Sequence, residues 1–360
     1  MTALTHHWRD YFARGKPTGN VSAETLRLIY SMWVIAFLFK HGGAAWDVTW
    51  HFRYLFDEFS PPHNVNTVGT VLALIVLAYQ TWTGVAATER GLFLIWTGWI
   101  FFLVSAPLDI LNHNLNGIDL TTWSVTHFML YTGTTMMLVG VLYSWLKLAP
   151  NNSLKIFYAV IIWTLLLDDV MFPLSQQEFG YIAYDAFLKG TSPASRELID
   201  LAGNTAVGIA KYAVENVPRW LYPIWMTVMA SLHFTVARRI QGWAWTATAM
   251  AALYLAFRFT AQTIAASFQF PQSFIPIMIL GAALLIDLAA RFKWKPILTA
   301  IILIIAYYSS AAVVGRATLM PDFDLWTAPI AFVLLWIGLE TWERFWAWLE
   351  KQNAEFTEVR

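Results

Sequence analysis

The chain has 360 residues, of which 58% are hydrophobic and 13% are charged, and its formal net charge is zero. Soluble globular proteins are about 45–50% apolar and about 25% charged, so this composition excludes an ordinary soluble protein and predicts a polytopic membrane protein without a nucleic-acid partner. The chain has no cysteine, which excludes disulfides and thiolate metal sites, so any metal ion must be bound by histidine, carboxylate or other oxygen ligands.

Ten segments are apolar and long enough to cross a bilayer, and we expect an all-α transmembrane bundle of nine or ten spans. A cytoplasmic N-terminus leaves 15 Lys and Arg residues in predicted cytoplasmic segments and the span ends next to them, and six in the external segments and their adjoining span ends. This asymmetry follows the positive-inside rule and makes the C-terminus cytoplasmic as well. We expect a bacterial or archaeal cell membrane. The predicted spans are 24–46, 65–87, 91–111, 123–146, 154–173, 219–237, 243–265, 273–290, 296–314 and 326–346.

The spans divide the chain into five predicted parts. Residues 1–23 form a cytoplasmic tail, and residues 24–173 hold two tandem helical hairpins and a fifth span. Residues 174–218 are polar and form an external loop, which is long enough for a lid, a docking surface or an interfacial helix. Residues 219–346 form a five-span bundle, and residues 347–360 form a second cytoplasmic tail.

Metal-ligand residues gather at the predicted outer end of the first span. Asp47 and His51 are spaced i, i+4, so both side chains lie on one face if the helix continues to this point. His63 follows the Pro61-Pro62 pair, where a returning helix can begin. One carboxylate and two imidazoles form a plausible set of ligands for a transition metal.

The same pattern recurs in the second hairpin, where Asp109 and His113 are again spaced i, i+4 and His127 follows. A tandem duplication of a helical hairpin explains the repeat, and the topology places both clusters at the external face. The six residues can therefore form two metal sites or one. The alternative is that these side chains are interfacial residues that reach the headgroup region.

The stretch Asp47-Val48-Thr49-Trp50-His51, continued by Asp57-Glu58-Phe59-Ser60-Pro61-Pro62-His63, resembles the metal-binding stretch of the C subunit of the particulate methane and ammonia monooxygenases. In that family an Asp-x3-His ending in Trp-His precedes an Asp-x-Phe-Ser/Thr-Pro-x-His. The resemblance implies that Asp47, His51 and His63 bind copper within the membrane. It covers 17 of the 360 residues, the gap between the histidines is one residue shorter here, and the second half of the chain shows no such pattern.

Three classes of function stay open. Copper is the first expectation for the metal, with zinc or iron as alternatives. A copper site predicts an oxidoreductase, or its metal-bearing subunit, that acts on an apolar substrate from the bilayer and takes electrons from a separate donor or from other membrane subunits. Zinc predicts a membrane hydrolase. The third class is a metal-handling, transport or structural subunit that is not an enzyme.

Other ionisable residues fall inside predicted spans. Asp168 and Asp169 lie near the outer end of the fifth span, and at most one of them joins a site, as a ligand or a proton relay, because adjacent helical positions point to different faces. Arg258 and Asp287 are expected to pair with each other, because unpaired charges are costly in a bilayer. His41 is either a further metal ligand or a hydrogen-bonded core histidine.

Overall fold

The computed structural model describes residue 17 and residues 21–54, 60–116, 122–215 and 217–358; for residues 113, 116 and 352–358 only the backbone is described. These residues form helices and turns, with no β-strand among them. The chain divides into two compact units, one of residues 1–216 and 257–273 and the other of residues 217–256 and 274–360. We refer to them as unit 1 and unit 2.

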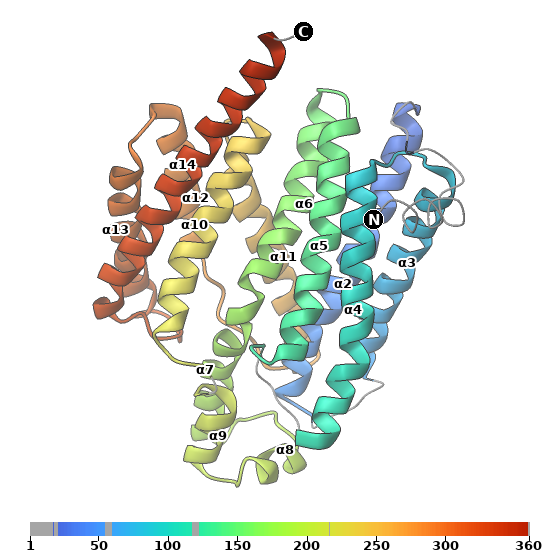
Figure 1. Ribbon diagram of the computed structural model, residues 1–360. Helices are drawn as coiled ribbons and strands as arrows, with labels where there is room; N and C mark the ends of the chain where they lie inside the picture. Colours follow the sequence, from blue (N-terminus) through green and yellow to red (C-terminus); the bar gives the residue numbers. More distant parts are fainter. Residues whose placement is uncertain (1–16, 18–20, 55–59, 117–121, 216, 359–360) are drawn as a thin grey trace. The chain divides into compact units, whose positions relative to one another are not determined.

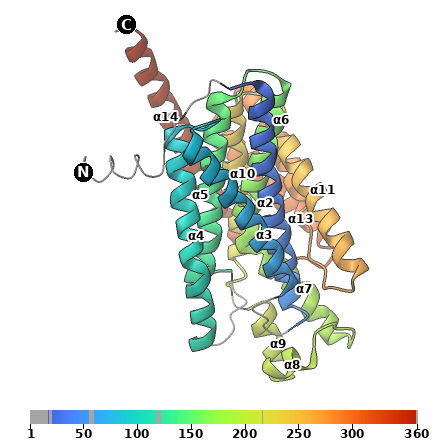
Figure 2. The same ribbon diagram turned by 90° about the vertical axis from the view of Figure 1, so that its right-hand side faces the viewer.

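Unit 1 is built around five long helices that run side by side (Figures 1 and 2). Three shorter helices, α7, α8 and α9, follow at the end of the unit where α2 ends. The helices are α2 (Ala23–His51), α3 (Pro61–Thr83), α4 (Glu89–Asn116), α5 (Val125–Leu148), α6 (Ser153–Met171), α7 (Ser175–Leu188), α8 (Arg196–Leu201) and α9 (Ala206–Ala213).

Unit 2 contains four helices that pack against one another, and α11 (Thr246–Ser267) is divided between the two units. The four helices are α10 (Leu221–Gln241), α12 (Met278–Phe292), α13 (Pro296–Val314) and α14 (Ala328–Glu358). A short 3-10 turn, η2 (Leu325–Thr327), leads into α14.

Each of the ten predicted spans overlaps a helix. Within the described residues, seven helical segments are long and apolar enough to cross a membrane, which confirms an all-helical integral membrane protein. The other three predicted spans are α10, α11 and α12. Helix α12 has 15 residues and a length of roughly 22 Å, which is less than the bilayer core of about 30 Å. The seven segments are 23–51, 61–83, 89–112, 125–148, 153–188, 296–314 and 325–351.

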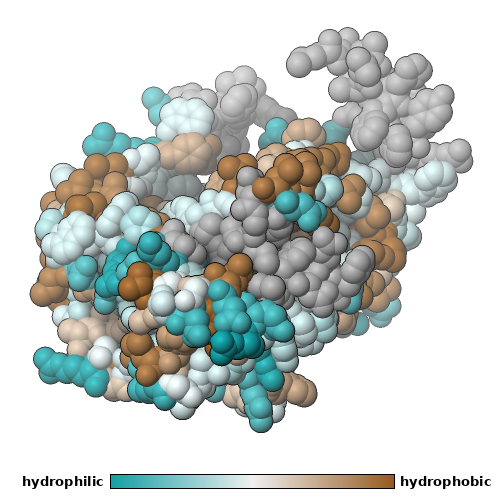
Figure 3. Space-filling model, turned by 90° about the horizontal axis from the view of Figure 1, so that it is seen from below, coloured by the Kyte–Doolittle hydropathy of each residue, from teal (hydrophilic) through white to brown (hydrophobic). Residues whose placement is uncertain are grey.

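The sides of the helices carry large apolar side chains that stay exposed. Phe93 is 69% exposed, Ile305 is 60% exposed and Leu28 is 63% exposed. In water such side chains would favour aggregation, whereas lipid chains solvate them. Viewed from the end that carries α8 and α9, hydrophilic residues gather in patches with hydrophobic residues between and beside them (Figure 3). Exposed apolar helix sides of this kind agree with the integral membrane protein that the long apolar helices indicate.

The segment predicted as an external loop, residues 174–218, is largely helical. Helix α6 continues through the 3-10 turn Phe172–Leu174 into α7, so that one apolar run extends over 153–188. Gln176, Gln177 and Glu178 looked like loop residues in the sequence, but all three are buried. The connection predicted for residues 174–218 thus contains three helices in its described part, and its first residues are buried.

Glycines allow the paired helices of unit 1 to approach closely. A Cβ atom at Gly43 of α2 would lie 2.6 Å from the backbone nitrogen of Asn66 in α3. In α4 and α5, a Cβ atom at Gly98 would lie 2.5 Å from the carbonyl oxygen of Gly133. Small residues at such contacts let helix backbones pack tightly where lipid supplies no hydrophobic driving force. Both hairpins of the predicted repeat are therefore closely packed pairs.

Two adjacent glycines of α2 provide a test of this packing. At Gly43 an added methyl group meets α3, whereas at Gly42 it meets no atom within 4 Å. We expect Gly43→Ala to lower the free energy of unfolding by about 1–3 kcal/mol through overpacking. We expect Gly42→Ala to be neutral or to stabilise by up to about 1 kcal/mol, because alanine favours the helix. Denaturant unfolding of both variants in detergent measures the difference, and equal effects would contradict this account of the hairpin.

Candidate metal site

Helix α2 carries two of the predicted ligands on its last turns. It does not stop at the predicted residue 46 but continues past Gly42 and Gly43 to His51. Asp47 and His51 therefore share one helical face, and Nε2 of His51 lies 3.5 Å from Oδ1 of Asp47. The condition set by the sequence, a helix unbroken to this point, is confirmed.

The first turn of α3 brings the third predicted ligand to the same point. Pro61 occupies the first turn, where its missing N–H costs no hydrogen bond, and Ser60 caps the helix by accepting from the His63 backbone N–H. The cap fixes His63 one turn into α3, facing the end of α2. Its Nε2 lies 3.0 Å from Oδ1 of Asp47.

The three side chains converge with the spacing of ligands around an ion. One ligand atom from each of Asp47, His51 and His63 lies within 4.8 Å of the other two. Ligands at about 2.0–2.1 Å from a tetrahedral ion lie roughly 3.3 Å apart, and the separations of 3.0 and 3.5 Å to Asp47 bracket this value. The residues are 15–35% exposed, so an ion can enter from outside.

One oxygen atom of the Asp47 carboxylate accepts no hydrogen bond of normal geometry from the described residues. This atom, Oδ1, is shielded from solvent, although two imidazole nitrogens lie within 3.5 Å. A buried acceptor without a donor is costly. A cation bound between the carboxylate and the imidazole nitrogens removes this cost, so the residues present fit a metal ion.

The end of α2 is held by residues far away in the sequence. The Tyr212 hydroxyl of α9 donates to the His51 carbonyl oxygen at 3.0 Å, and Thr49 donates to the Pro271 carbonyl oxygen at 2.6 Å. Arg53 donates to the Phe268 carbonyl oxygen at 2.7 Å. These contacts fix the backbone that carries Asp47 and His51. Sequence reasoning missed them, because no local pattern marks a tyrosine 161 residues away as a partner of His51.

The second predicted cluster is described only in part. Nε2 of His127 lies 3.4 Å from Oδ1 of Asp109, and the Thr126 hydroxyl donates to the same oxygen at 2.5 Å. The His113 side chain lies outside the described residues. The structure therefore brings Asp109 and His127 together and leaves the third predicted ligand untested.

The two hairpins share a local design. In α5, Ser124 caps the helix by accepting from the His127 backbone N–H, just as Ser60 accepts from His63 in α3. Each histidine then meets an aspartate near the end of the preceding helix. His127 also interacts electrostatically with Asp47, so the two pairs are neighbours at the same end of unit 1.

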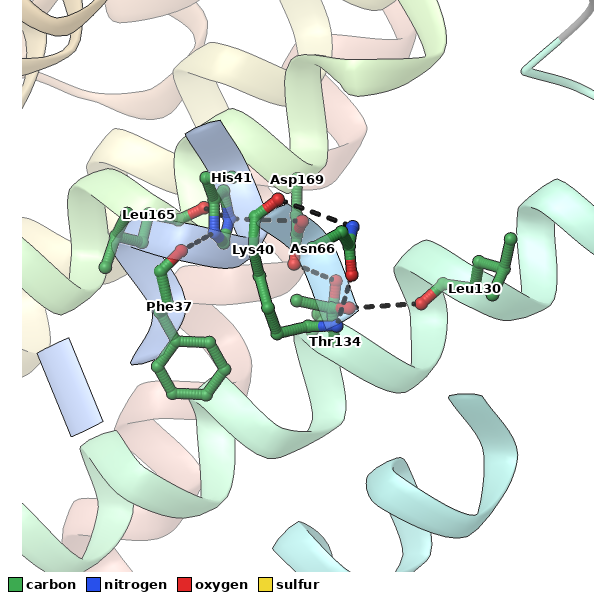
Figure 4. Close-up of polar contacts among 9 residues, drawn as sticks. Phe37, Lys40, His41, Asn66, Leu130, Thr134, Leu165 and Asp169 are labelled. Atoms are coloured by element: carbon green, nitrogen blue, oxygen red, sulfur yellow. Dashed lines mark hydrogen bonds and ion pairs between the residues drawn. The ribbon is translucent and has the colours of Figure 1, made fainter. Parts of the chain in front are cut away.

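His41 belongs to a buried polar cluster and not to the ligand set (Figure 4). Its Nδ1 lies 2.9 Å from the Phe37 carbonyl oxygen, and its Nε2 lies 3.1 Å from the Leu165 carbonyl oxygen and 3.3 Å from Oδ1 of Asp169. All three partners accept hydrogen bonds, so both ring nitrogens carry protons and His41 is a cation paired with Asp169. No nitrogen lone pair is left for a metal. The histidine is therefore a hydrogen-bonded core residue.

Lys40 is the second buried cation of this cluster. Its Nζ donates to Oδ1 of Asn66 at 3.3 Å and to the Thr70 hydroxyl at 3.0 Å, and it lies 3.4 Å from the centre of the Phe102 ring. Figure 4 shows the side chain extended beside Asn66. Asn66 returns a hydrogen bond to the Lys40 carbonyl oxygen. These contacts tie α2 to α3 one to two turns away from the three predicted ligands.

The expected Arg258–Asp287 pair is wrong, although both residues are paired. Nη2 of Arg258 lies 2.6 Å from Oε2 of Glu178 and 2.8 Å from the Ser273 hydroxyl. Asp287 lies 3.3 Å from Nε of Arg238 and accepts from Thr248. The principle that charges are paired inside a bilayer holds. The sequence does not mark Glu178 as the partner of Arg258, because the polar residues 176–178 follow the predicted fifth span and look exposed.

Comparison with protein-family models, curated proteins and solved structures found no match for this chain.

Removing the Tyr212 hydroxyl tests how the end of α2 is held. We expect Tyr212→Phe to lower the free energy of unfolding by about 1 kcal/mol. Burial raises the pKa of Tyr212, so the phenol keeps its proton in the folded state and the loss should be constant below about pH 10, the unperturbed value. Tyr184→Phe is the matched control, because this hydroxyl makes no hydrogen bond within the described part of the chain. Equal losses in the two variants would contradict the assigned role.

The His41–Asp169 pair predicts strong coupling in a double-mutant cycle. Asp169→Asn leaves a buried cation without its counter-ion, and we expect a loss of about 3–5 kcal/mol in the free energy of unfolding. Adding His41→Gln removes that cation, so the double variant should lose clearly less than the sum of the two single losses. Denaturant unfolding in detergent provides the four values. Additive losses would mean that the two groups are not an ion pair.

Proposed function

We propose that unit 1 binds one transition-metal ion through Asp47, His51 and His63, and that the protein is a copper-dependent membrane oxidoreductase, or its metal-bearing subunit. The observation that carries the proposal is the convergence of three ligand atoms within 4.8 Å, on helix ends held by distant contacts. Two imidazoles and one carboxylate suit copper, zinc or iron. The resemblance of residues 47–63 to the copper-binding stretch of the membrane monooxygenases favours copper.

The substrate class follows from the surroundings of the site. Three protein ligands leave coordination positions open, and a bound copper ion supplies redox chemistry at those positions. Apolar molecules concentrate in the bilayer that surrounds the helices and reach the site without crossing water. An apolar small molecule is therefore the proposed substrate, with electrons supplied by a separate donor or subunit.

The second Asp–His pair gives the site an acid–base group. His127 lies 3.4 Å from Asp109, which also accepts from Thr126, so the carboxylate fixes the imidazole in one orientation. An imidazole oriented by a carboxylate is a common proton donor and acceptor in catalytic sites. We assign Asp109 and His127 to holding a proton beside the metal. His113 and the question of a second ion stay a sequence-based prediction.

We further propose ten spans with both termini in the cytoplasm, which places the site at the outer end of unit 1. The proposal rests on the uneven distribution of Lys and Arg along the chain.

Metal analysis of the purified full chain tests the proposal. We expect about one copper ion per chain after loading, with a Cu(II) electron paramagnetic resonance spectrum split by nitrogen ligands. Asp47→Asn, His51→Gln and His63→Gln should each reduce bound copper by tenfold or more. His233→Gln, in α10 of unit 2, is the control and should keep it. Bound copper should also fall between pH 7 and pH 5, because protons compete for the imidazoles.

Three results would contradict this function. Selective retention of zinc with no nitrogen-coordinated copper would favour a hydrolase. Copper that is bound without nitrogen splitting, or that survives all three substitutions, would remove the assigned site. No stoichiometric metal at all would favour a protein that is not a metalloenzyme.

A further inference from the structure

Unit 2 contains a cavity of about 810 Å³ at the ends of its helices. Helices α10, α12, α13 and α14 pack against one another (Figure 1), and the cavity is lined where α10 and α12 end, where α13 begins and along α14. Helix α14 has 31 residues and a length of roughly 46 Å, so it extends beyond a bilayer core of about 30 Å. The residues of α14 that line the cavity, from Leu339 to Glu350, lie in the middle part of this helix. Because α10 and α12 end and α13 begins at the cavity, we place it at the level of the lipid headgroups.

Most charges around the cavity are already paired within the protein. Arg238 lies 3.3 Å from Asp287, and Arg239 lies 3.2 Å from Glu350. Glu340 is 3.1 Å from Arg344 on the same helix. These pairs neutralise one another and leave the other charged residues of the lining to meet a ligand.

Two lysines and one glutamate are the charged lining residues that make no ion pair within the described part of the chain. Lys293 and Lys295 flank Trp294 in the short connection between α12 and α13, and all three line the cavity. Both lysines are exposed, and neither makes an ion pair within the described residues. Glu343 is exposed in the same way on α14. The unpaired charge of the lining is therefore positive by one unit.

The backbone adds to this positive potential. Helix α13 begins at Pro296 directly after Lys295, and no side chain caps its first turn. The N-terminus of a helix carries partial positive charge and free N–H groups, which favour a phosphate. Trp294 and Trp346 supply amphipathic indoles of the kind found at headgroup level. A phosphate group with an apolar attachment fits all of these features.

We propose that this cavity binds the phosphate of an anionic phospholipid headgroup, with Lys293 and Lys295 as its charged contacts. Basic pockets between helices at one membrane face bind anionic headgroups in this way. The proposal concerns unit 2 alone and does not depend on a metal in unit 1. If the lipid site of unit 2 is disproved, the proposed metal site of unit 1 is not affected, and the reverse also holds.

Lys293 allows its charge to be removed without harm to the fold. Its φ angle is +53°, a left-handed conformation that glycine adopts more easily than lysine. Lys293→Gly therefore removes the charge and relieves the backbone at once. We combine it with Lys295→Gln. The control, Arg90→Gln with Lys147→Gln, removes two exposed cations from helix ends of unit 1.

The experiment measures binding of phosphatidylglycerol and phosphatidylcholine to the delipidated full chain by native mass spectrometry, with inorganic phosphate as a third probe. We expect preferential binding of phosphatidylglycerol. The Lys293→Gly/Lys295→Gln variant should bind it about 30-fold more weakly, because each basic residue near the membrane contributes about a factor of five. The Arg90/Lys147 control should bind as the unchanged protein does. Glu343→Gln should strengthen binding by up to about fivefold, since it removes a repulsive charge.

Several outcomes would overturn the proposal. Equal binding of the two lipids, or an affinity unchanged in the lysine variant, would remove the headgroup site. Weaker phosphatidylglycerol binding in Glu343→Gln would mean that the glutamate holds a cationic group. Inorganic phosphate that binds as tightly as the lipid would assign the cavity to a free anion.

Discussion

Helices α2 and α3 approach so closely at Gly43 that a Cβ atom there would lie 2.6 Å from Asn66 N and 2.9 Å from Pro62 O. This contact lies one turn from Asp47 on α2, and it includes Pro62, the residue before His63 on α3. It therefore sets the separation at which the carboxylate meets the imidazole, 3.0 Å. The distance between the backbones of α2 and α3 decides whether the three ligand side chains can meet. The positions of the ligand atoms therefore depend on this contact.

Buried ion pairs link the helices of unit 1 that carry and surround the candidate metal site. In a bilayer an unpaired charge is costly, so each pair holds its helices in one register. His41 and Asp169 join α2 to α6, and Glu178 and Arg258 join α7 to α11. We infer that these contacts serve the site by holding the frame on which it is built. They occupy the hydrogen-bonding groups that would otherwise compete for a metal.

Much of the fold follows from composition and periodicity. The ten predicted segments all overlap helices, seven of the described helical segments are long and apolar enough to cross a membrane, and the predicted bounds 296–314 are those of α13. The Asp47-x3-His51 spacing predicted a shared face because helical geometry is local.

Long-range partners were not predictable in this way. Tyr212 and Glu178 lie in a segment whose sequence is polar, and only tertiary packing leaves Tyr212 partly buried and Glu178 buried. Asp109 and His127 were brought together as the repeat predicts, because a serine caps both α3 and α5 three residues before a histidine.

Anomalous diffraction at the copper edge from crystals of the loaded full chain is the most direct test of the metal site. We expect one strong peak about 2.0 Å from Nε2 of His51, Nε2 of His63 and a carboxylate oxygen of Asp47. A peak elsewhere in the chain, or none between these three side chains in fully loaded protein, would contradict it.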